Sequence, residues 1–376
     1  MIQLVEVTKK YGEFNAVRGV SLSVESGEVC VLLGPSGCGK STTLKMINRM
    51  LDPTSGTVHV EGKNVKDLRP ELLRRRIGYV IQYIGLFPHY TVAQNIGVVC
   101  NLLGWEKQLV IRRVMELLEL VGLDPAAYAQ KYPHELSGGE AQRIGVARAL
   151  AADPPILLMD EPFGAVDPLT RETLQTEFVR IQQELKKTVV FVTHDLDEAI
   201  RVSTRIVLMK EGRIVQHDTP EKILASPKNK FVHDFIGADR ALKRLARFPV
   251  DTVMRPAVNA TISSGSTKEE LFSAAESARG DGMWFLWVVD ERGKLAGWMD
   301  TRRAKDPNTA VEAVTFVVPE RIAVTRESTC KTALSRMLGE GIKVVPVIDV
   351  SGRVVGEISL AEIERITEEV AHTWQE

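Results

Sequence analysis

The sequence predicts an α/β fold in two unequal parts, and three observations support that prediction. Short β-branched runs alternate with helical stretches from residue 1 to about residue 236. A glycine-rich loop joins one of these runs to a helical stretch. The last third of the chain contains an internal repeat. We therefore expect a larger α/β domain followed by a smaller one that is built from two similar halves.

Each element of the first part is predicted from its own pattern. The β-branched runs at residues 2–7, 29–33, 156–159 and 189–193 read as strands. Apolar residues recur at a spacing of three and four around residues 110–121, which indicates one face of a helix. A Glu211-Gly212 turn predicts a hairpin between residues 206–209 and 213–215, and Pro220 begins a last helix. We place the first domain at residues 1–237 and a basic linker at 238–248.

The second domain, residues 249–376, contains the repeat, with copies at about 249–307 and 312–372. Residues 285–300 read FLWVVDERGKLAGWMD and residues 344–359 read VVPVIDVSGRVVGEIS. Asp290, Gly293 and Gly297 align with Asp349, Gly352 and Gly356 at one constant offset. Each copy is a strand, a tight turn and a strand, preceded by a helical stretch. We expect the two copies to pack face to face.

Length, charge and cysteine content narrow the class of protein. A chain of 376 residues is long enough for two or three domains. The chain has 48 lysine and arginine residues and 49 aspartate and glutamate residues. It therefore lacks the overall excess of positive charge that would favour nucleic acid as a partner. The four cysteines form no CxxC pair, as expected of reduced thiols. Neither a secretory signal nor an apolar run of about 20 residues is apparent, so we expect any membrane role to require a partner.

The strongest motif is the loop after the strand at residues 29–33. It matches GxxxxGK[ST] and consists of Gly34, Pro35, Ser36, Gly37, Cys38, Gly39, Lys40, Ser41 and Thr42. The glycines let backbone N–H groups surround phosphate oxygens at a helix N-terminus. We expect Lys40 to reach the β- and γ-phosphates of ATP and Ser41 to bind Mg²⁺. Cys38 is interpreted as a small filler rather than a redox switch.

A second strand, at residues 156–159, ends in Asp160 and Glu161. Both carboxylates would emerge beside the phosphate loop if this strand neighbours the one that precedes the loop. Asp160 would then hold Mg²⁺ through water, and Glu161 would polarise the attacking water. An apolar run that ends in two acids is weak evidence alone, but with the phosphate loop present the catalytic interpretation is favoured.

A third motif is Leu136-Ser137-Gly138-Gly139-Glu140, at the start of a helical run. Free N–H groups at such a helix start attract an anion, although a simple N-cap would use the same residues. The motif resembles the signature of ATP-binding cassettes, which implies a P-loop NTPase cassette with a helical subdomain. In that family Ser137, Gly138 and Gly139 would contact the γ-phosphate held by a second copy, so the active species would be a head-to-tail homodimer. The family often has Gln where this chain has Glu140.

The same resemblance assigns roles to four more residues. Tyr11 would stack on adenine, Gln82 would sense the γ-phosphate and help to bind Mg²⁺, His194 would contact the γ-phosphate, and Asp167 would link the two sites of the dimer. Each of these residues alone could have a purely structural role, as an aromatic residue in a turn, a solvated polar group or a core histidine. Their combined order along the chain supports the cassette interpretation.

Residues 79–96, YVIQYIGLFPHYTVAQNI, together with the C-terminal repeat, resemble the ATP-binding subunit of quaternary-amine importers, those for glycine betaine, carnitine or choline. In that family residues 83–88 would dock a helix of the membrane subunit, although an ordinary exposed loop is the alternative. The resemblance implies permease subunits and an extracytoplasmic solute-binding protein as partners. It places the chain peripherally on the cytoplasmic face of the inner (plasma) membrane.

The repeat resembles paired cystathionine β-synthase (CBS) modules, so the second part is expected to be an α/β tandem CBS domain that regulates transport. Such modules bind an adenine nucleotide or a cyclic dinucleotide between copies, and Ser359 and Glu362 match the residues that contact phosphate and ribose. Asp300 and Arg303 are the poorer match in the first copy. A purely structural dimerisation domain is the alternative. Trp284, Trp287 and Trp298 are expected in the core or an interface rather than in an amine cage.

Three functions from different classes fit these motifs. The leading one is the ATP-hydrolysing subunit of a multi-subunit importer, for an osmoprotectant quaternary amine or another solute. A soluble cassette ATPase acting on nucleic acid or ribosomes is the second, but the coiled-coil or basic insertions typical of that class are absent from the sequence. The third is a nucleotide-sensing switch in which hydrolysis is secondary.

Overall fold

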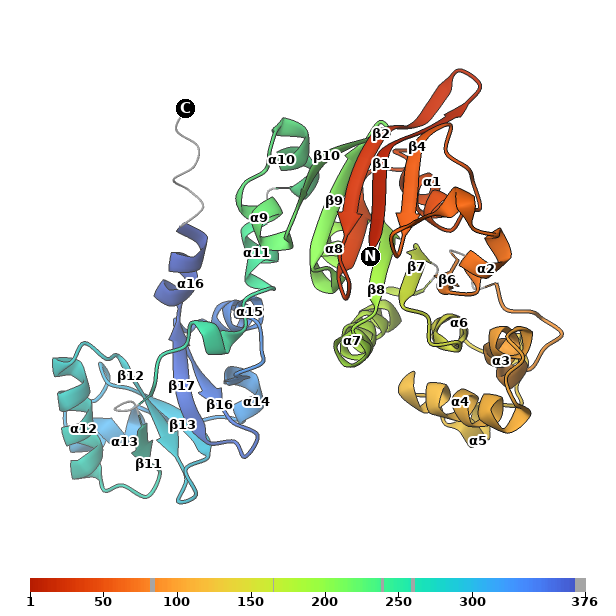
Figure 1. Cartoon of the computed structure of the whole chain (residues 1–376). Coiled ribbons are helices and arrows are strands. Elements are labelled where there is room, and N and C mark those ends of the chain that lie inside the picture. The colour runs from red at the N-terminus through yellow and green to blue at the C-terminus, as the bar shows by residue number, and fades with distance from the viewer. Residues whose placement is uncertain (82–84, 165, 238–239, 258–260, 369–376) are drawn as a thin grey trace. The chain divides into compact units, whose positions relative to one another are not determined.

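A computed structural model describes residues 1–81, 85–164, 166–237, 240–257 and 261–368 (Figure 1). The chain divides into two compact units. The first contains Met1–Ile223 and Pro227–Ile236, and the second contains Leu224–Ser226 and the chain from Gly237 onward. This division lies beside the expected boundary at residue 237. Among the described residues, no helix combines the length and the apolar character needed to cross a bilayer.

The core of the first unit is a six-stranded sheet with the order β10-β9-β3-β8-β7-β6. In that order its strands are β10 (Arg213–Asp218), β9 (Arg205–Lys210), β3 (Val29–Leu33), β8 (Thr188–Thr193), β7 (Ile156–Asp160) and β6 (Ile77–Val80). The β9–β10 hairpin is antiparallel, as the Glu211-Gly212 turn predicts, and the other pairs are parallel. Every residue of β3, β7 and β8 is buried, because both faces of this sheet are covered.

The strand that ends in Asp160 is not the immediate neighbour of the strand before the phosphate loop, because β8 lies between β7 and β3. All three strands run parallel, so their carboxyl ends still reach the same edge of the sheet. Residues that follow β3 and β7 can therefore meet across the end of β8.

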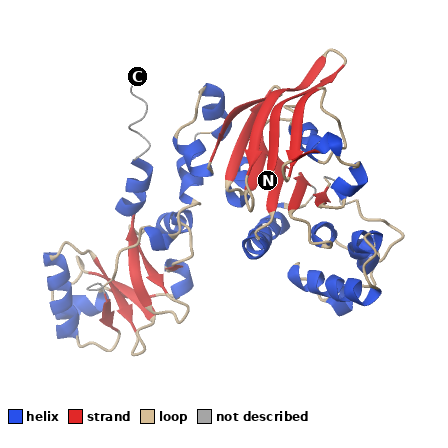
Figure 2. Ribbon diagram, in the orientation of Figure 1, coloured by secondary structure: helices blue, strands red, loops and turns tan. Residues whose placement is uncertain are grey.

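A second, antiparallel sheet has the order β2-β1-β4-β5. It consists of β1 (Ile2–Tyr11), β2 (Phe14–Val24), β4 (Ser55–Val60) and β5 (Lys63–Asn64). Helix α1 (Lys40–Ile47) contributes Leu44 and Ile47 to a hydrophobic cluster that also contains Leu4 of β1 and Leu32 of β3. Helix α1 therefore packs against both sheets, which are shown as strands in Figure 2.

The segment between β6 and β7 forms a helical subdomain (Figure 2). It contains α3 (Val92–Leu102), α4 (Lys107–Leu120), α5 (Pro125–Tyr128) and α6 (Gly138–Leu150). Helix α4 buries Val110, Val114, Leu117 and Leu118, so the helix predicted from their spacing is confirmed. The first unit also contains α2 (Pro70–Arg74), α7 (Pro168–Leu185), α8 (Leu196–Val202) and α10 (Lys230–Ile236). The division between the units falls within α9 (Pro220–Ala225).

The second unit contains two similar halves, preceded by α11 (Arg240–Leu245). The first half contains β11 (Thr261–Ser263), α12 (Lys268–Gly280), β12 (Phe285–Val289), β13 (Leu295–Asp300), α13 (Pro307–Glu312) and β14 (Val314–Phe316). The second contains α14 (Pro319–Ile322), β15 (Val324–Thr325), α15 (Cys330–Glu340), β16 (Val344–Ile348), β17 (Val354–Ser359) and α16 (Leu360–Glu368). The sheets have the orders β11-β12-β13-β14 and β15-β16-β17.

The two halves meet at equivalent positions of their hairpin turns. Lys294 forms an antiparallel bridge with Arg353, its counterpart in the repeat, and the Leu295 N–H donates to the Gly352 carbonyl at 3.0 Å. Beside this bridge Trp287 and Leu295 pack with residues that include Val344 and Val354 of the second half. The copies therefore pack against each other through apolar surface that neither could bury alone.

Candidate nucleotide site

The loop between β3 and α1 has backbone conformations that only glycine adopts easily. Gly34, Gly37 and Gly39 have φ values of 148°, 77° and 104°. A Cβ atom on Gly34 would lie 2.3 Å from the Met209 carbonyl oxygen, and one on Gly39 would lie 2.4 Å from that of Ala16. A Cβ on Gly37 would meet nothing within 4 Å. The surrounding protein thus leaves no room for a side chain at Gly34 or Gly39, whereas a side chain at Gly37 would face open space.

Lys40 is the first residue of α1 and is only 5% exposed. Its Nζ donates to the carbonyl oxygens of Gly34 at 2.7 Å and Pro35 at 3.0 Å, so the ammonium group lies within the curve of the loop. A positive charge in this place suits a polyphosphate. Burial raises the pKa of the Cys38 thiol, which keeps this side chain neutral and agrees with its interpretation as a small filler.

Ser41 and Asp160 come together although they are 119 residues apart in the chain. The Ser41 Oγ donates to the Asp160 Oδ1 at 2.7 Å, and Asp160 is 6% exposed at the end of β7. A hydroxyl and a carboxylate provide the hard oxygen ligands that Mg²⁺ prefers, and Mg²⁺ is commonly held by one or two carboxylates together with substrate phosphates. The residues present therefore fit Mg²⁺. Gln82, the third expected ligand, lies outside the described residues.

Glu161 follows Asp160 and turns away from the strand through a left-handed backbone conformation with φ of 45°. Its N–H donates to the Val192 carbonyl at 3.0 Å, which ties it to β8. The Glu161 Oε2 lies 3.4 Å from the Nδ1 of His194, which follows β8. The side chain of Glu161 is 20% exposed and that of His194 is 59% exposed. The two residues expected to act on water and γ-phosphate are thus adjacent, with His194 exposed and Glu161 half-buried.

The signature segment opens α6 through a capping box. The Ser137 Oγ accepts from the Glu140 N–H at 3.3 Å, and the Ser137 N–H donates to the Glu140 Oε2 at 2.7 Å. The Tyr128 hydroxyl donates to the other carboxylate oxygen of Glu140. This bond, followed by the one from Ser137, lowers the pKa of Glu140 to about 2. The side chain of Glu140 thus braces the helix start, and Tyr128 is a supporting residue that no sequence motif marks.

The remaining predicted site residues of the cassette lie on other elements of the first unit. Tyr11 ends β1, is 47% exposed and has the Lys9 Nζ 5.3 Å from its ring centroid. Asp167 caps α7, where its Oδ1 accepts from the Thr170 N–H at 3.1 Å. A Cβ on Gly139 would lie 2.6 Å from the Thr170 Cγ2, so the signature segment and the start of α7 approach closely.

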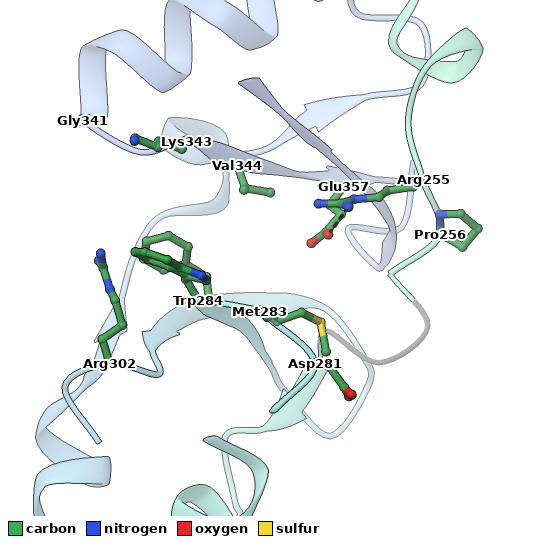
Figure 3. Close-up of a pocket in the computed structure, with 12 residues that line it drawn as sticks. Arg255, Pro256, Asp281, Met283, Trp284, Arg302, Gly341, Lys343, Val344 and Glu357 are labelled. Carbon is green, nitrogen blue, oxygen red and sulfur yellow. Dashed lines mark ion pairs between the residues drawn. The ribbon is translucent and has the colours of Figure 1, made fainter. Parts of the chain in front are cut away.

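The second unit has a pocket of about 710 Å³ between its two halves (Figure 3). Its lining includes Arg255, Trp284, Arg302, Lys343 and Glu357. The Arg302 guanidinium lies 4.9 Å from the ring centroid of Trp284, which is 57% exposed. Trp284 therefore belongs to the pocket rather than to a core, whereas Trp287 is buried as expected.

Ser359 and Glu362, the expected ligand residues, are not among the lining residues of this pocket. The Ser359 hydroxyl and N–H both donate to Glu362, which lowers the pKa of the Glu362 carboxyl against the opposing effect of its burial. Asp300 holds Arg302 through two bonds of 2.8 and 2.9 Å. Sequence reasoning missed the aromatic and cationic lining of Trp284, Phe285 and Arg302, because the exposure of Trp284 and its contact with Arg302 arise only in the folded unit.

Comparison with known proteins agrees with this geometry. The protein-family model described as "ABC transporter" matches residues 17–164. The osmoprotectant import ATP-binding protein OsmV of Salmonella typhimurium is 44% identical, over 96% of this chain and 94% of its own length. The glycine betaine/carnitine/choline transport ATP-binding protein OpuCA of Bacillus subtilis is also 44% identical, over 96% and 95%. The structure of the ATP-binding cassette MJ0796, a dimer bound to ADP and Pi, covers 58% of this chain and 99% of its own, with a TM-score of 0.54 and 35% identity.

Proposed function

The chain belongs to the ATP-binding subunits of ABC transporters, and we propose that it powers the import of a quaternary amine such as glycine betaine, carnitine or choline. Cassettes of this family hydrolyse Mg-ATP as dimers and work with membrane permease subunits. The observation that carries the finer proposal is the similarity along nearly the whole chain, including the second unit, to one relative named for osmoprotectants and one named for these three solutes. Permease subunits with a solute-binding protein, and a place on the cytoplasmic face of the membrane, belong to the same proposal.

The geometry supports one division of roles in hydrolysis. The backbone of the phosphate loop and Lys40 bind the phosphates, with the ammonium already held beside the loop carbonyls. Ser41 and Asp160, with Gln82, would hold Mg²⁺, which neutralises charge on the phosphates when bound. Glu161 accepts a hydrogen bond from the attacking water and draws off its proton, and His194 lies beside it to contact the γ-phosphate. Ser137, Gly138 and Gly139 of the partner copy complete each site, Tyr11 stacks on adenine, and Asp167 links the sites.

The second unit is proposed to regulate transport as a tandem CBS domain. Its pocket joins an exposed indole to guanidinium groups, a combination that suits the base and phosphate of an adenine nucleotide or a cyclic dinucleotide. Titration of the Lys40→Ala chain with AMP and with cyclic di-AMP tests this, because that substitution removes the phosphate-loop contact. We expect quenching of tryptophan fluorescence, lost in a further Trp284→Ala variant. Unchanged fluorescence with both nucleotides would leave the domain a structural dimerisation module.

The decisive test of the importer proposal is gentle purification of the tagged chain from native membranes with ATP and Mg²⁺. We expect a multi-spanning protein and a solute-binding protein to accompany it. Cells that carry the chain should take up labelled glycine betaine, carnitine or choline, and cells with Glu161→Gln should not. Removal of residues 248–376 should leave uptake present but unregulated, whereas it would abolish function if the chain were chiefly a nucleotide-sensing switch. Recovery of ribosomes or nucleic acid without a membrane protein would favour the soluble ATPase instead.

A further inference from the structure

Helices α7 and α8 face each other through polar residues that have no part in the roles assigned so far. The two helices pack against each other in the first unit, and both are labelled in Figure 1. Across their contact the Arg171 Nη1 lies 4.0 Å from the Asp195 Oδ2, the Arg201 Nη2 lies 2.6 Å from the Glu172 Oε1, and the Gln175 Nε2 donates to the Glu198 Oε1 at 3.3 Å. Of these residues, Arg171 also forms hydrogen bonds with the segment that precedes α7.

The Arg171 guanidinium also reaches the segment that precedes α7. The guanidinium Nη2 donates to the Val166 carbonyl at 2.9 Å. The backbone N–H of Arg171 donates to the Asp167 carbonyl at 2.8 Å. The Val166 N–H in turn donates to the Phe163 carbonyl at 3.2 Å, and Gly164 donates to the carbonyl of Glu161 at 3.1 Å. Arg171 is therefore bonded to Val166 and Asp167, and the described residues 161–164, 166 and 167 are called the Glu161–Asp167 turn below.

On its other side Arg171 faces the turn that holds His194. Asp195 caps α8, since its Oδ1 accepts from the N–H groups of Asp197 at 2.8 Å and Glu198 at 3.1 Å. Its Oδ2 remains directed to Arg171. His194 precedes Asp195, so a displacement of this cap would move the imidazole relative to Glu161.

We propose that Arg171 is a positioning residue for ATP hydrolysis, because it ties the Glu161–Asp167 turn to the Asp195 cap beside His194. This inference rests on the role of Glu161 and His194 in hydrolysis. One guanidinium bonds a carbonyl in one turn and faces a carboxylate in the other, a planar arrangement that a single ammonium group cannot reproduce. Glu198 lies nearby and is 6% exposed, and burial raises its pKa. The side chains of Arg171 and Asp195 are more accessible, at 32% and 39% exposed.

The test compares Arg171→Gln and Arg171→Lys with Arg201→Gln in the full chain. Arg201 is the matched control, because it forms an ion pair across the same two helices while neither Val166 nor Asp195 is its partner in that pair. We expect Arg171→Gln to lower kcat by roughly tenfold to a hundredfold, as misplacement of reacting groups does, with the affinity for ATP unchanged. Arg171→Lys should recover part of the loss. Arg201→Gln should lower Tm by a similar amount with kcat near that of the wild type.

A double-mutant cycle separates positioning from general destabilisation. If Arg171 acts through His194, adding Arg171→Gln to His194→Ala should lower kcat by less than about twofold further, because coupled substitutions are not additive. Equal kcat losses in Arg171→Gln and Arg201→Gln, or a full additional loss in the His194→Ala background, would overturn the proposal. An inactive Arg201→Gln variant with intact Arg171→Gln would overturn it too. Loss of hydrolysis in Glu161→Gln is measured in parallel, so a failure of the underlying ATPase assignment is recognised separately.

Discussion

The Ser41 hydroxyl donates to the Asp160 carboxylate across the edge of the central sheet, at 2.7 Å. One residue follows β3 and the other ends β7, with β8 between those strands. The hydrogen bond is possible because three parallel strands deliver their carboxyl ends to one edge. It places two oxygen ligands for a divalent cation beside the phosphate loop.

This pairing makes the Mg²⁺ dependence of hydrolysis sensitive to Ser41. We expect Ser41→Ala to raise the Mg²⁺ concentration that gives half-maximal ATPase activity by about tenfold or more, because one oxygen of the pair is lost. The measurement is a Mg²⁺ titration of activity at fixed ATP. Ser23→Ala is a suitable control, since the Ser23 hydroxyl on β2 donates to the exposed Glu25 carboxylate at 3.1 Å, outside the nucleotide site. An unchanged Mg²⁺ midpoint in Ser41→Ala would remove this residue from the cation site.

Substitutions of Glu161 and Lys40 should have different effects, the first on the rate of ATP hydrolysis and the second on the affinity for ATP. We expect Glu161→Gln to keep the affinity for ATP while lowering kcat by about 10² to 10⁴-fold, the usual contribution of a positioned base. Single-turnover hydrolysis and a binding titration measure the two quantities. Near-normal turnover would show that another group activates the water.

Lys40→Ala should instead weaken the binding of ATP itself. The ammonium that lies against the Gly34 and Pro35 carbonyls is the charge expected to meet the phosphates. A nucleotide titration followed by fluorescence checks this. If the affinity for ATP stays at the wild-type value, the phosphate-binding role of Lys40 is refuted.

Local motifs make the conformation of the phosphate loop predictable, because they encode local geometry. Gly34 and Gly39 adopt positive φ within a short loop, and the helix start at Lys40 is fixed by the residues next to it. The strand order could not be predicted in the same way, since insertion of β8 between β3 and β7 depends on packing over the whole sheet. Tyr128 and Arg171 were also missed. Each acts on a residue that is near in space only after helices of the first unit have packed.

In the second unit, too, the sequence predicted local structure but not contacts between distant residues. The repeat predicted two halves of matching strands and turns, and the Asp290 and Asp349 side chains cap those turns in the same way. The exposure of Trp284 was not predicted, because an aromatic residue at a strand start can face a core or a pocket with equal ease. Trp284 faces the pocket with the Arg302 guanidinium over its ring, and this contact forms only when the unit has folded.

The two kinds of glycine in the first unit should differ in their tolerance of alanine. Gly62 has φ of 76°, and a Cβ atom there would meet nothing within 4 Å, so Gly62→Ala should cost about 1 kcal/mol from backbone strain alone. At Gly39 the same strain is joined by a clash with the Ala16 carbonyl, so Gly39→Ala should lower stability by several times as much. Denaturant unfolding of both variants measures the difference. Similar losses would mean that the Ala16 segment moves away freely.

The Glu140 carboxylate should make stability depend on pH. Its folded pKa of about 2 lies below the ordinary value of 4.5, chiefly through the Tyr128 hydroxyl and the Ser137 N–H. A lowered pKa means that the stabilisation is present above pH 4.5 and is lost as the pH falls toward 2. We therefore expect Glu140→Gln to have a lower Tm than the wild type at pH 7, with the difference shrinking below pH 4.5.

Scanning calorimetry at pH 7, 5.5, 4.5 and 3.5 compares the two chains, with the pH values set on either side of the ordinary pKa near 4.5. Tyr128→Phe supplies the control, because it removes the hydroxyl that contributes most to the shift. In that background the effect of Glu140→Gln at pH 7 should be smaller. A Tm difference that stays constant over the whole range would show that ionisation of Glu140 does not brace the start of α6, and that the amide replaces the carboxylate in the capping box on shape alone.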